Sequence, residues 1–156
     1  MSRTPAFAAN PSPSSWKPVT GVAEFGEAFD LLGDWESRYQ YLIELGEGLE
    51  AMPQGQMVEE NRVKQCMSTV FVHAGRDKEC LGRIVFHGYC DTSIIRGVVA
   101  LLVRLFSGKT PHEVVRTDVD ELFENLHLEE HLSPNRHVGI YAIVDKMKAQ
   151  AAAFLA

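Results

Sequence analysis

The sequence predicts an α+β fold, in which a small antiparallel sheet is packed with several helices. Helical patterns come first along the chain, two β-rich runs follow in the middle, and helical patterns return afterwards, with no strand–helix alternation. The 156 residues, 46 % hydrophobic and 23 % charged, suit one globular domain. We expect that domain over residues 24–156.

The first 23 residues are rich in proline, serine and alanine and contain no acid. Proline fixes a backbone angle and removes a hydrogen-bond donor, so residues 1–23 are predicted to be a disordered tail. A cleaved transit peptide is the alternative, although Arg3 and Lys17 are few basic residues for one. We therefore expect a cytoplasmic protein, or a plastid or mitochondrial one if the tail is cleaved.

Two helices are predicted at the start of the domain. Residues 24–32 form the first, which ends at Gly33, and Asp34 caps the second. Apolar residues recur along the second at helical spacing: Trp35, Tyr39, Leu42, Ile43 and Leu49. A loop is expected over residues 52–60, and a short strand over residues 63–64.

A hairpin is predicted next, because residues 68–73 and 81–87 are rich in β-branched and aromatic side chains. They flank AGRDKE, residues 74–79, which is predicted to be the turn. Residues 91–107 then form a strongly apolar helix that ends at Gly108.

Three further helices complete the predicted order. Thr110-Pro111-His112-Glu113 has the capping-box arrangement, residues 117–125 form a short helix, and Ser133-Pro134 begins a long amphipathic one. Its apolar side carries Ile140, Ile143, Val144, Met147 and Phe154.

Charge and hydropathy exclude several classes of function. The formal net charge of -6 argues against nucleic acid as a partner. The longest apolar run, residues 94–106, is too short to span a bilayer and is broken by Arg96 and Arg104, so no membrane association is expected. Three cysteines without a CxxC pair argue against a disulfide framework and favour free thiols in a reducing compartment.

One motif suggests a zinc site. The stretch from His127 to His131 reads HLEEH and fits H-x-x-E-H, which in one zinc-peptidase class places two ligands a helical turn apart. Ser133-Pro134 begins another helix directly afterwards, so the long helix that would carry the ligands is missing. We expect no metal here.

The cysteines leave two interpretations open. Cys66, Cys80 and Cys90 could be iron–sulfur ligands in a cluster scaffold, although their spacing lacks the short pairs typical of such sites. Cys80 is expected at the turn end of the hairpin, opposite Cys66. A thiol reacts only as thiolate, and Lys64, two residues before Cys66 in an extended segment, would favour that form. From the residues alone, Cys66 is either a packing residue or a reactive thiol.

Four blocks of sequence resemble the SufE family of sulfur-acceptor proteins. They are LLGDWESRYQYLIELGEGL, NRVKQCMSTVFV, DTSIIRGVVALLVRLFSGKTP and EHLSPNRHVGIYAIVDKMKA. The blocks occur in the family's order and cover nearly the whole predicted domain. The resemblance implies an α+β fold like that of SufE and of IscU-like cluster scaffolds.

The resemblance also implies a role in iron–sulfur cluster assembly. A SufE-like protein binds a SufS-like cysteine desulfurase, takes its persulfide sulfur onto its own cysteine, and passes the sulfur to a SufBCD-like scaffold. The acceptor matches Cys66, and the arginine of the Ser-Pro-x-Arg block matches Arg136. Pyridoxal phosphate belongs to the desulfurase, so no cofactor is expected in this chain, which would be a monomer or weak homodimer.

Three positions are expected to contact the desulfurase, and two others depart from the family's pattern. An acid at the start of the apolar helix matches Asp91, and Arg62 and Lys64 flank the cysteine loop, so all three are expected in the partner interface. The family usually has glycine before the cysteine, where this chain has Gln65. Cys90 is unusual at its position, and we expect it at the same end of the sheet as Cys66. It is either a small helix-entry residue in place of serine or a thiol that forms a disulfide with Cys66 on oxidation.

Overall fold

The computed structural model describes residues 22–155, and its first element is helix α2, Val22–Leu32. This helix begins two residues before the expected domain start at residue 24, so residues 22 and 23 do not belong to a tail. The predicted disorder of residues 1–21 lies outside the described residues. Gly33 ends α2 with φ of 82°, a conformation that glycine adopts without strain.

Helix α3, Trp35–Glu47, follows as predicted, with Asp34 as its N-cap. The Asp34 carboxylate accepts a hydrogen bond from the Ser37 N–H at 2.7 Å. That bond lowers the pKa of Asp34 below its ordinary value, because it favours the charged form. Arg38 joins the two helices by donating from Nε to the Phe29 carbonyl at 2.8 Å.

The sheet is a two-stranded antiparallel hairpin of β1, Val70–Arg76, and β2, Ile84–Cys90. The predicted turn over residues 74–79 is wrong, because residues 74–76 continue β1 and the connection runs over residues 77–83. Arg76 pairs with Ile84, and the Asp77 N–H donates to the Arg83 carbonyl at 2.9 Å. Gly82, with φ of 83°, turns the chain before β2.

The two histidines of the hairpin lie within its strands, because both strands continue past the predicted ends at residues 73 and 87. His73 and His87 are paired directly opposite each other in the middle of the sheet. His87 Nδ1 lies 2.9 Å from Gln56 Oε1, whereas His73 Nδ1 is buried without a hydrogen-bond partner among the described residues. Burial lowers the pKa of His73, and the neighbouring His87 lowers it further.

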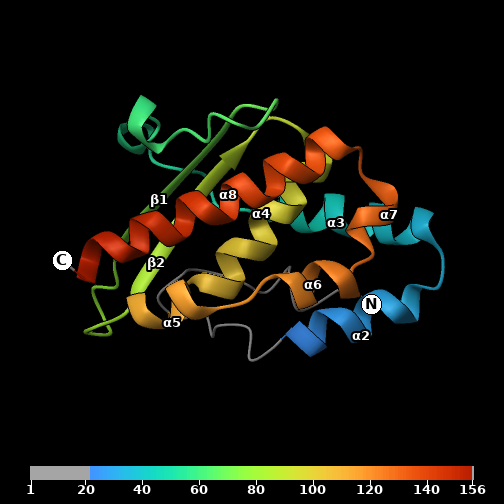
Figure 1. The fold of residues 1–156 in the computed structure, drawn as a ribbon, viewed down its shortest axis with the longest axis horizontal. Coiled ribbons are helices and arrows are strands. Elements are labelled where there is room, and N and C mark those ends of the chain that lie inside the picture. Colours follow the sequence, from blue (N-terminus) through green and yellow to red (C-terminus); the bar gives the residue numbers. More distant parts are fainter. Residues whose placement is uncertain (1–21, 156) are drawn as a thin grey trace.

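Helix α4, Ser93–Phe106, is the centre of the core and packs between α3 and the sheet, as Figure 1 shows. Ten of its residues are buried, from Ile94 to Phe106, which confirms the predicted apolar helix. Glycine allows the close crossing with α3, because a Cβ on Gly97 would lie 2.1 Å from the Leu42 carbonyl oxygen. Gly108, with φ of 89°, follows the helix as expected.

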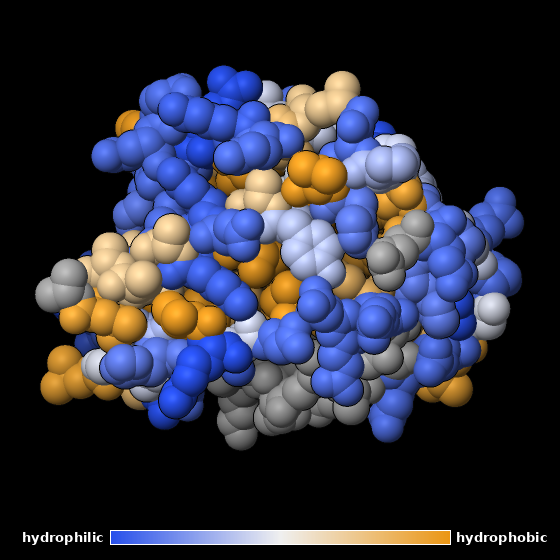
Figure 2. All heavy atoms as spheres, in the orientation of Figure 1, coloured by the Kyte–Doolittle hydropathy of each residue, from blue (hydrophilic) through white to orange (hydrophobic). Residues whose placement is uncertain are grey.

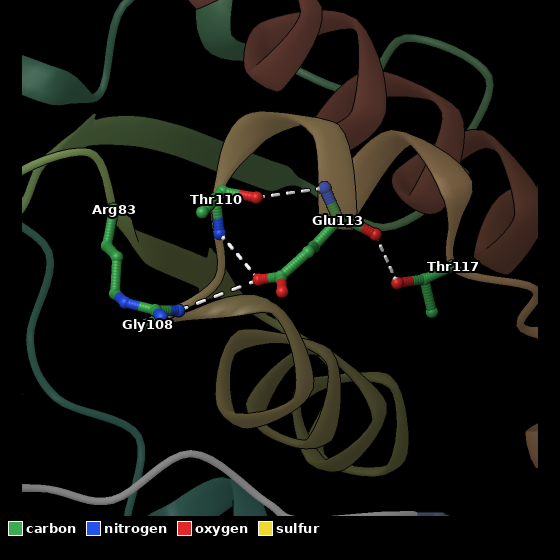
Figure 3. Close-up of polar contacts among 5 residues, drawn as sticks. All are labelled: Arg83, Gly108, Thr110, Glu113 and Thr117. Carbon is green, nitrogen blue, oxygen red and sulfur yellow. Dashed lines mark hydrogen bonds and ion pairs between the residues drawn. The ribbon is translucent and has the colours of Figure 1, made fainter.

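A capping box begins helix α5, Pro111–Arg116, as Figure 3 shows. Thr110 Oγ1 accepts from the Glu113 N–H at 3.2 Å, and Glu113 Oε1 accepts from the Thr110 N–H at 2.9 Å. Arg83 Nη1 lies 3.6 Å from the same carboxylate oxygen and donates to the Gly108 carbonyl at 2.7 Å. The box therefore fixes the α4–α5 connection to the start of β2.

Two short helices lead to the last one. Helix α6, Asp120–Asn125, begins later than the predicted residue 117, because Thr117 is still the C-cap of α5. Helix α7, Leu128–His131, has four residues. Helix α6 contacts α2, and His131 of α7 stacks on Trp35 of α3.

The long C-terminal helix α8, Pro134–Ala152, crosses the front of the molecule beside the hairpin in Figure 1. Ser133 Oγ caps it by accepting from the Arg136 N–H at 3.3 Å. Gln150 joins it to β1 by donating to the Val72 carbonyl at 2.7 Å. Its buried side includes the predicted residues Ile140, Ile143, Val144 and Met147, whereas Phe154 lies in the 3-10 turn Ala153–Leu155.

Figure 2 shows that the face with α8 is mostly hydrophilic, with hydrophobic side chains exposed in patches between polar ones. Among the described helices, none is long and apolar enough to cross a membrane.

Candidate functional site

Cys66 lies in a loop between the 3-10 turn Glu59–Asn61 and strand β1. The loop begins beside the strand, since Arg62 forms an isolated bridge with Phe71 and the Val63 N–H donates to the Val70 carbonyl at 2.9 Å. Lys64 and Gln65 then turn the chain, and the Cys66 N–H points back to the Val63 carbonyl at 3.5 Å. The extended segment predicted at residues 63–64 is therefore reduced to one bridge, at Arg62.

The turn changes the expected role of Lys64. Lys64 Nζ lies 3.9 Å from Glu59 Oε2, and its side chain is 69 % exposed. The expectation that Lys64 favours the thiolate form of Cys66 assumed an extended segment, and the structure has a turn at Lys64 and Gln65 instead. Exposed pairs of this kind contribute little stability, so Lys64 is free to exchange partners at the protein surface.

The Cys66 side chain is half-buried against helix α8. A Cβ atom on Gly139 would lie 3.0 Å from Cys66 Sγ and 3.4 Å from its Cα, so the thiol rests directly on the glycine backbone. The following residue, Met67, is 82 % exposed. The thiol thus lies at the surface of the domain, between a buried helix face and an exposed loop.

Three interactions fix the end of the cysteine loop to the end of the hairpin. The Thr69 N–H donates to Asp91 Oδ1 at 3.0 Å, and the Asp91 N–H returns a bond to the Thr69 carbonyl at 3.3 Å. Ser68 Oγ lies 2.7 Å from Thr92 Oγ1, the N-cap residue of α4. Asp91 is exposed, as a residue that contacts a partner must be, and these bonds show that it also anchors the cysteine loop.

Cys90 is the last residue of β2 and is buried, with 1 % of its surface exposed. Its sulfur accepts from the Thr92 N–H at 3.4 Å and donates to the Thr92 carbonyl at 3.6 Å. Burial raises the pKa of the Cys90 thiol to about 11, and nearby Cys66 adds to that increase. Cys90 is therefore a weak nucleophile at neutral pH.

The relative positions of the three free thiols are as predicted. Cys90 pairs with Val70 at the end of the hairpin where the Cys66 loop enters, whereas the exposed Cys80 lies in the turn at the other end. In the described part of the chain, no three residues among His, Cys, Asp and Glu are grouped to hold a metal ion. A cluster held by all three cysteines has no support in this geometry.

Arg136 lies in the first turn of α8 and is exposed. It precedes Gly139 by three residues, so the two lie on neighbouring positions of the same helix side. Among the side chains that the structure describes, none forms a hydrogen bond or ion pair with the Arg136 guanidinium. The structure thus brings a cation to the helix turn beside the thiol and leaves it available.

The H-x-x-E-H stretch does not have the geometry of a zinc site. His127 has φ of 56° and stands outside α7 as its N-cap, so the two histidines do not lie on one helix. His131 stacks on Trp35, with ring centroids 3.8 Å apart and planes at 9°. Glu130 lies 3.8 Å from His127 Nδ1 and 3.9 Å from His131 Nε2. The stacking on Trp35 and the pairs with Glu130 hold both histidines within the fold, and neither arrangement is that of metal ligands.

A hollow of about 530 Å³ opens beside the cysteine loop. Gln65 lines it on one side, and the outward side of α8 lines the other with residues that include His137, Val138 and Tyr141. Tyr141 is held there by donating to Asp120 Oδ1 at 2.6 Å. The hollow leaves room for a segment of another protein next to the Cys66 loop.

Known proteins are similar to this chain in sequence and in fold. The model of the SufE family, described as an Fe-S metabolism associated domain, matches residues 23–151. The chain belongs to the SufE family. It is 37 % identical over 135 residues to an uncharacterized SufE-like protein of Rhizobium meliloti, covering 85 % of this chain and 96 % of that protein. An uncharacterized SufE-like protein of Rhizobium etli is 36 % identical over 125 residues, covering 79 % and 84 %.

A solved structure has a similar fold as well. The solution structure of a hypothetical protein from Thermus thermophilus superposes with a TM-score of 0.70 at 24 % identity, covering 86 % of this chain and 95 % of that one. The predicted α+β fold is confirmed. Membership of the SufE family associates the chain with iron–sulfur metabolism.

Sequence reasoning missed two features of the site. The first is Gly139, which could have been noticed because a glycine in a helix interior is unfavourable and so signals a close approach. The second is the anchor of the cysteine loop, formed by Ser68, Thr69, Asp91 and Thr92. It depends on the hairpin register, and the turn predicted at residues 74–79 gives a different register.

Proposed function

We propose that this SufE-family chain accepts sulfur from a cysteine desulfurase as a persulfide on Cys66 and delivers it to an iron–sulfur cluster assembly scaffold. The observation that carries the proposal is the free Cys66 thiol, half-buried on Gly139, in a surface loop beside a hollow that a partner segment can enter. Of the three thiols, Cys90 is buried and hydrogen-bonded, and Cys80 lies at the far end of the hairpin.

The transfer is a thiol–persulfide exchange. The Cys66 thiolate attacks the outer sulfur of the desulfurase's cysteine persulfide; an S–S bond forms on Cys66 as the original one breaks. The departing desulfurase thiolate takes a proton, and the transferred sulfur keeps its oxidation state, so no reductant is consumed. A thiol of the scaffold can remove the sulfur by the same reaction. Neither step needs a cofactor in this chain.

Arg136 is proposed to support the reaction. Its exposed guanidinium begins the helix on which Cys66 rests, and a guanidinium offers fixed donors to a developing thiolate or persulfide anion. The alternative role, an ordinary ion pair with an acid, has no partner among the described residues.

Docking is proposed to involve Arg62, Lys64 and Asp91. Arg62 and Lys64 are exposed at the start of the cysteine loop, and Asp91 is exposed at the other end of it. Charges at the rim of an interface mainly set the association rate and its salt dependence. We therefore expect charge reversal at Arg62 and Lys64 to slow association with the desulfurase, more at low salt than at high salt. An association rate that is unchanged at both would remove them from the interface.

The test of the function measures stimulation of a desulfurase. Wild-type protein should increase sulfide release from L-cysteine, and Cys66→Ser should abolish the increase, because the hydroxyl cannot accept the sulfur. Cys80→Ser is the matched control and should behave as wild type. Full stimulation by Cys66→Ser would contradict the proposal. Iron in the purified protein, lost when any of the three cysteines is replaced, would instead indicate a cluster scaffold.

A further inference from the structure

Gly139 occupies a position in helix α8 that ordinary helix chemistry does not explain. It is the sixth residue of a 19-residue helix, buried, and flanked by residues of normal helical geometry. Glycine is among the poorest helix formers in such a position, because it loses the most backbone freedom on folding. Something else must require it.

The required feature is the contact with Cys66. A Cβ atom at position 139 would stand 3.0 Å from the Cys66 sulfur, 3.4 Å from its Cα and 3.5 Å from its Cβ. The last two distances are ordinary van der Waals contacts, whereas a separation of 3.0 Å is so tight that the sulfur would have to move by a few tenths of an ångström. The sulfur atom itself therefore fills the space that a side chain at 139 would need.

The loop has little freedom to avoid that clash. Thr69 is bonded to Asp91 on one side of the thiol, and Val63 is bonded to Val70 on the other. With both ends fixed to the hairpin, only the short segment around Cys66 can move. A side chain at 139 must therefore push the thiol away from α8 and towards solvent.

We propose that Gly139 is a positioning residue for Cys66. Because Gly139 has no side chain, the Cys66 thiol can lie against helix α8, and this contact determines how exposed the thiol is. The consequence for sulfur transfer rests on the proposed acceptor function: a persulfide on Cys66 would be shielded on the side where the thiol meets α8. The position of the thiol itself is independent of that function and can be tested without a partner.

The first experiment measures alkylation of Cys66 by iodoacetamide in the full-length protein, with Cys80 as the internal reference because it is exposed at the far end of the hairpin. Gly139→Ala should raise the Cys66 rate relative to Cys80 by about fivefold or more, the change expected when a methyl is forced into filled space. Gly55→Ala is the control, since a Cβ there meets nothing within 4 Å. An unchanged Cys66-to-Cys80 ratio in Gly139→Ala would overturn the proposal.

A second experiment separates the clash from a general effect on α8. In a Cys66→Ala background the sulfur is gone, so Gly139→Ala should raise the melting temperature as better helix formation predicts. In the wild-type background the same substitution should lower it or leave it unchanged. An equal change in melting temperature on Gly139→Ala in both backgrounds would show that the Cys66 sulfur is not the reason why position 139 requires glycine.

A third experiment tests the functional consequence. Protein loaded by a desulfurase and L-cysteine is exposed to dithiothreitol, which reduces the persulfide to thiol and sulfide and becomes a disulfide itself. Gly139→Ala should release sulfide faster than wild type, and Gly55→Ala at the wild-type rate. Failure of wild-type protein to load would contradict the acceptor function and leave the positioning result intact. Equal release rates from loaded Gly139→Ala and wild type would refute the shielding.

Discussion

Removing the Asp91 carboxylate tests the anchor of the cysteine loop. Asp91→Ala deletes the acceptor of the Thr69 N–H bond at 3.0 Å and leaves the backbone bond from Asp91 to the Thr69 carbonyl. A side-chain cap on an exposed backbone N–H contributes about 1 kcal/mol. In a domain of this size, that loss should lower the melting temperature by roughly 3 to 5 °C.

The loss of this hydrogen bond should destabilise mainly the cysteine loop, because Thr69 is the residue directly before β1. A local loss of about 1 kcal/mol raises the population of an opened loop about fivefold. We therefore expect iodoacetamide to alkylate Cys66 up to about fivefold faster in Asp91→Ala, with Cys80 unchanged, measured by mass spectrometry of the labelled peptides.

The matched control is Asp77→Ala at the opposite end of the same hairpin. Asp77 Oδ1 accepts from the Glu79 N–H at 2.9 Å, so the substitution removes the same kind of bond from an exposed turn. It should lower stability similarly and leave the Cys66 rate as in wild type. Equal acceleration by both variants would mean that the effect is global. An Asp91→Ala protein with wild-type melting and wild-type Cys66 reactivity would refute the anchor.

Three further predictions follow from other contacts. Thr110→Ala should lower the free energy of unfolding by about 1 kcal/mol in urea titration, because it removes the acceptor of the Glu113 N–H; an unchanged value would contradict the capping box of Figure 3. Because burial lowers the pKa of His73 from 6.5, the unfolded chain binds more protons below that pH, so stability should fall as pH drops through about 6.5. His73→Gln should flatten that fall in thermal melts, and an identical slope in both proteins would rule His73 out as its source. We also expect added oxidised glutathione to pair Cys66 with Cys90. Cys66 attacks the glutathione disulfide first and releases one glutathione, since the pKa of Cys90 is raised to about 11, and Cys90 then displaces the second glutathione from Cys66. Oxidised wild type should lose two free thiols in a thiol assay and recover acceptor activity on reduction, whereas equal inactivation of Cys90→Ser would show that the pairing does not occur.

Much of the fold could be predicted from local signals. Asp34, Thr110 and Ser133 each stand before a helix with side-chain oxygens that accept backbone N–H groups, and each cap is present. The apolar helix over residues 93–106 follows from its composition. These signals act within a few residues, so they can be read without knowledge of the tertiary structure.

The hairpin turn and the site could be predicted only in part. AGRDKE reads as a turn because it is polar and contains glycine, yet Gly75 lies on the open face of the sheet, where polarity does not interrupt pairing. The same limit applies to Lys64, whose direction depends on one turn, and to Gly139, whose importance comes from a contact across 73 positions of sequence with Cys66. Contacts between distant segments are set by packing, which local patterns do not contain.

Sulfur on Cys66 is the central claim, and intact-mass measurement tests it most directly. After incubation with a cysteine desulfurase and L-cysteine, the protein should gain the mass of one sulfur atom, the gain should disappear with dithiothreitol, and peptide mapping should place it on Cys66. Cys66→Ser should gain nothing, and Cys80→Ser should gain sulfur as wild type does. A sulfur that maps to Cys80 or Cys90, or persists in Cys66→Ser, would contradict the account.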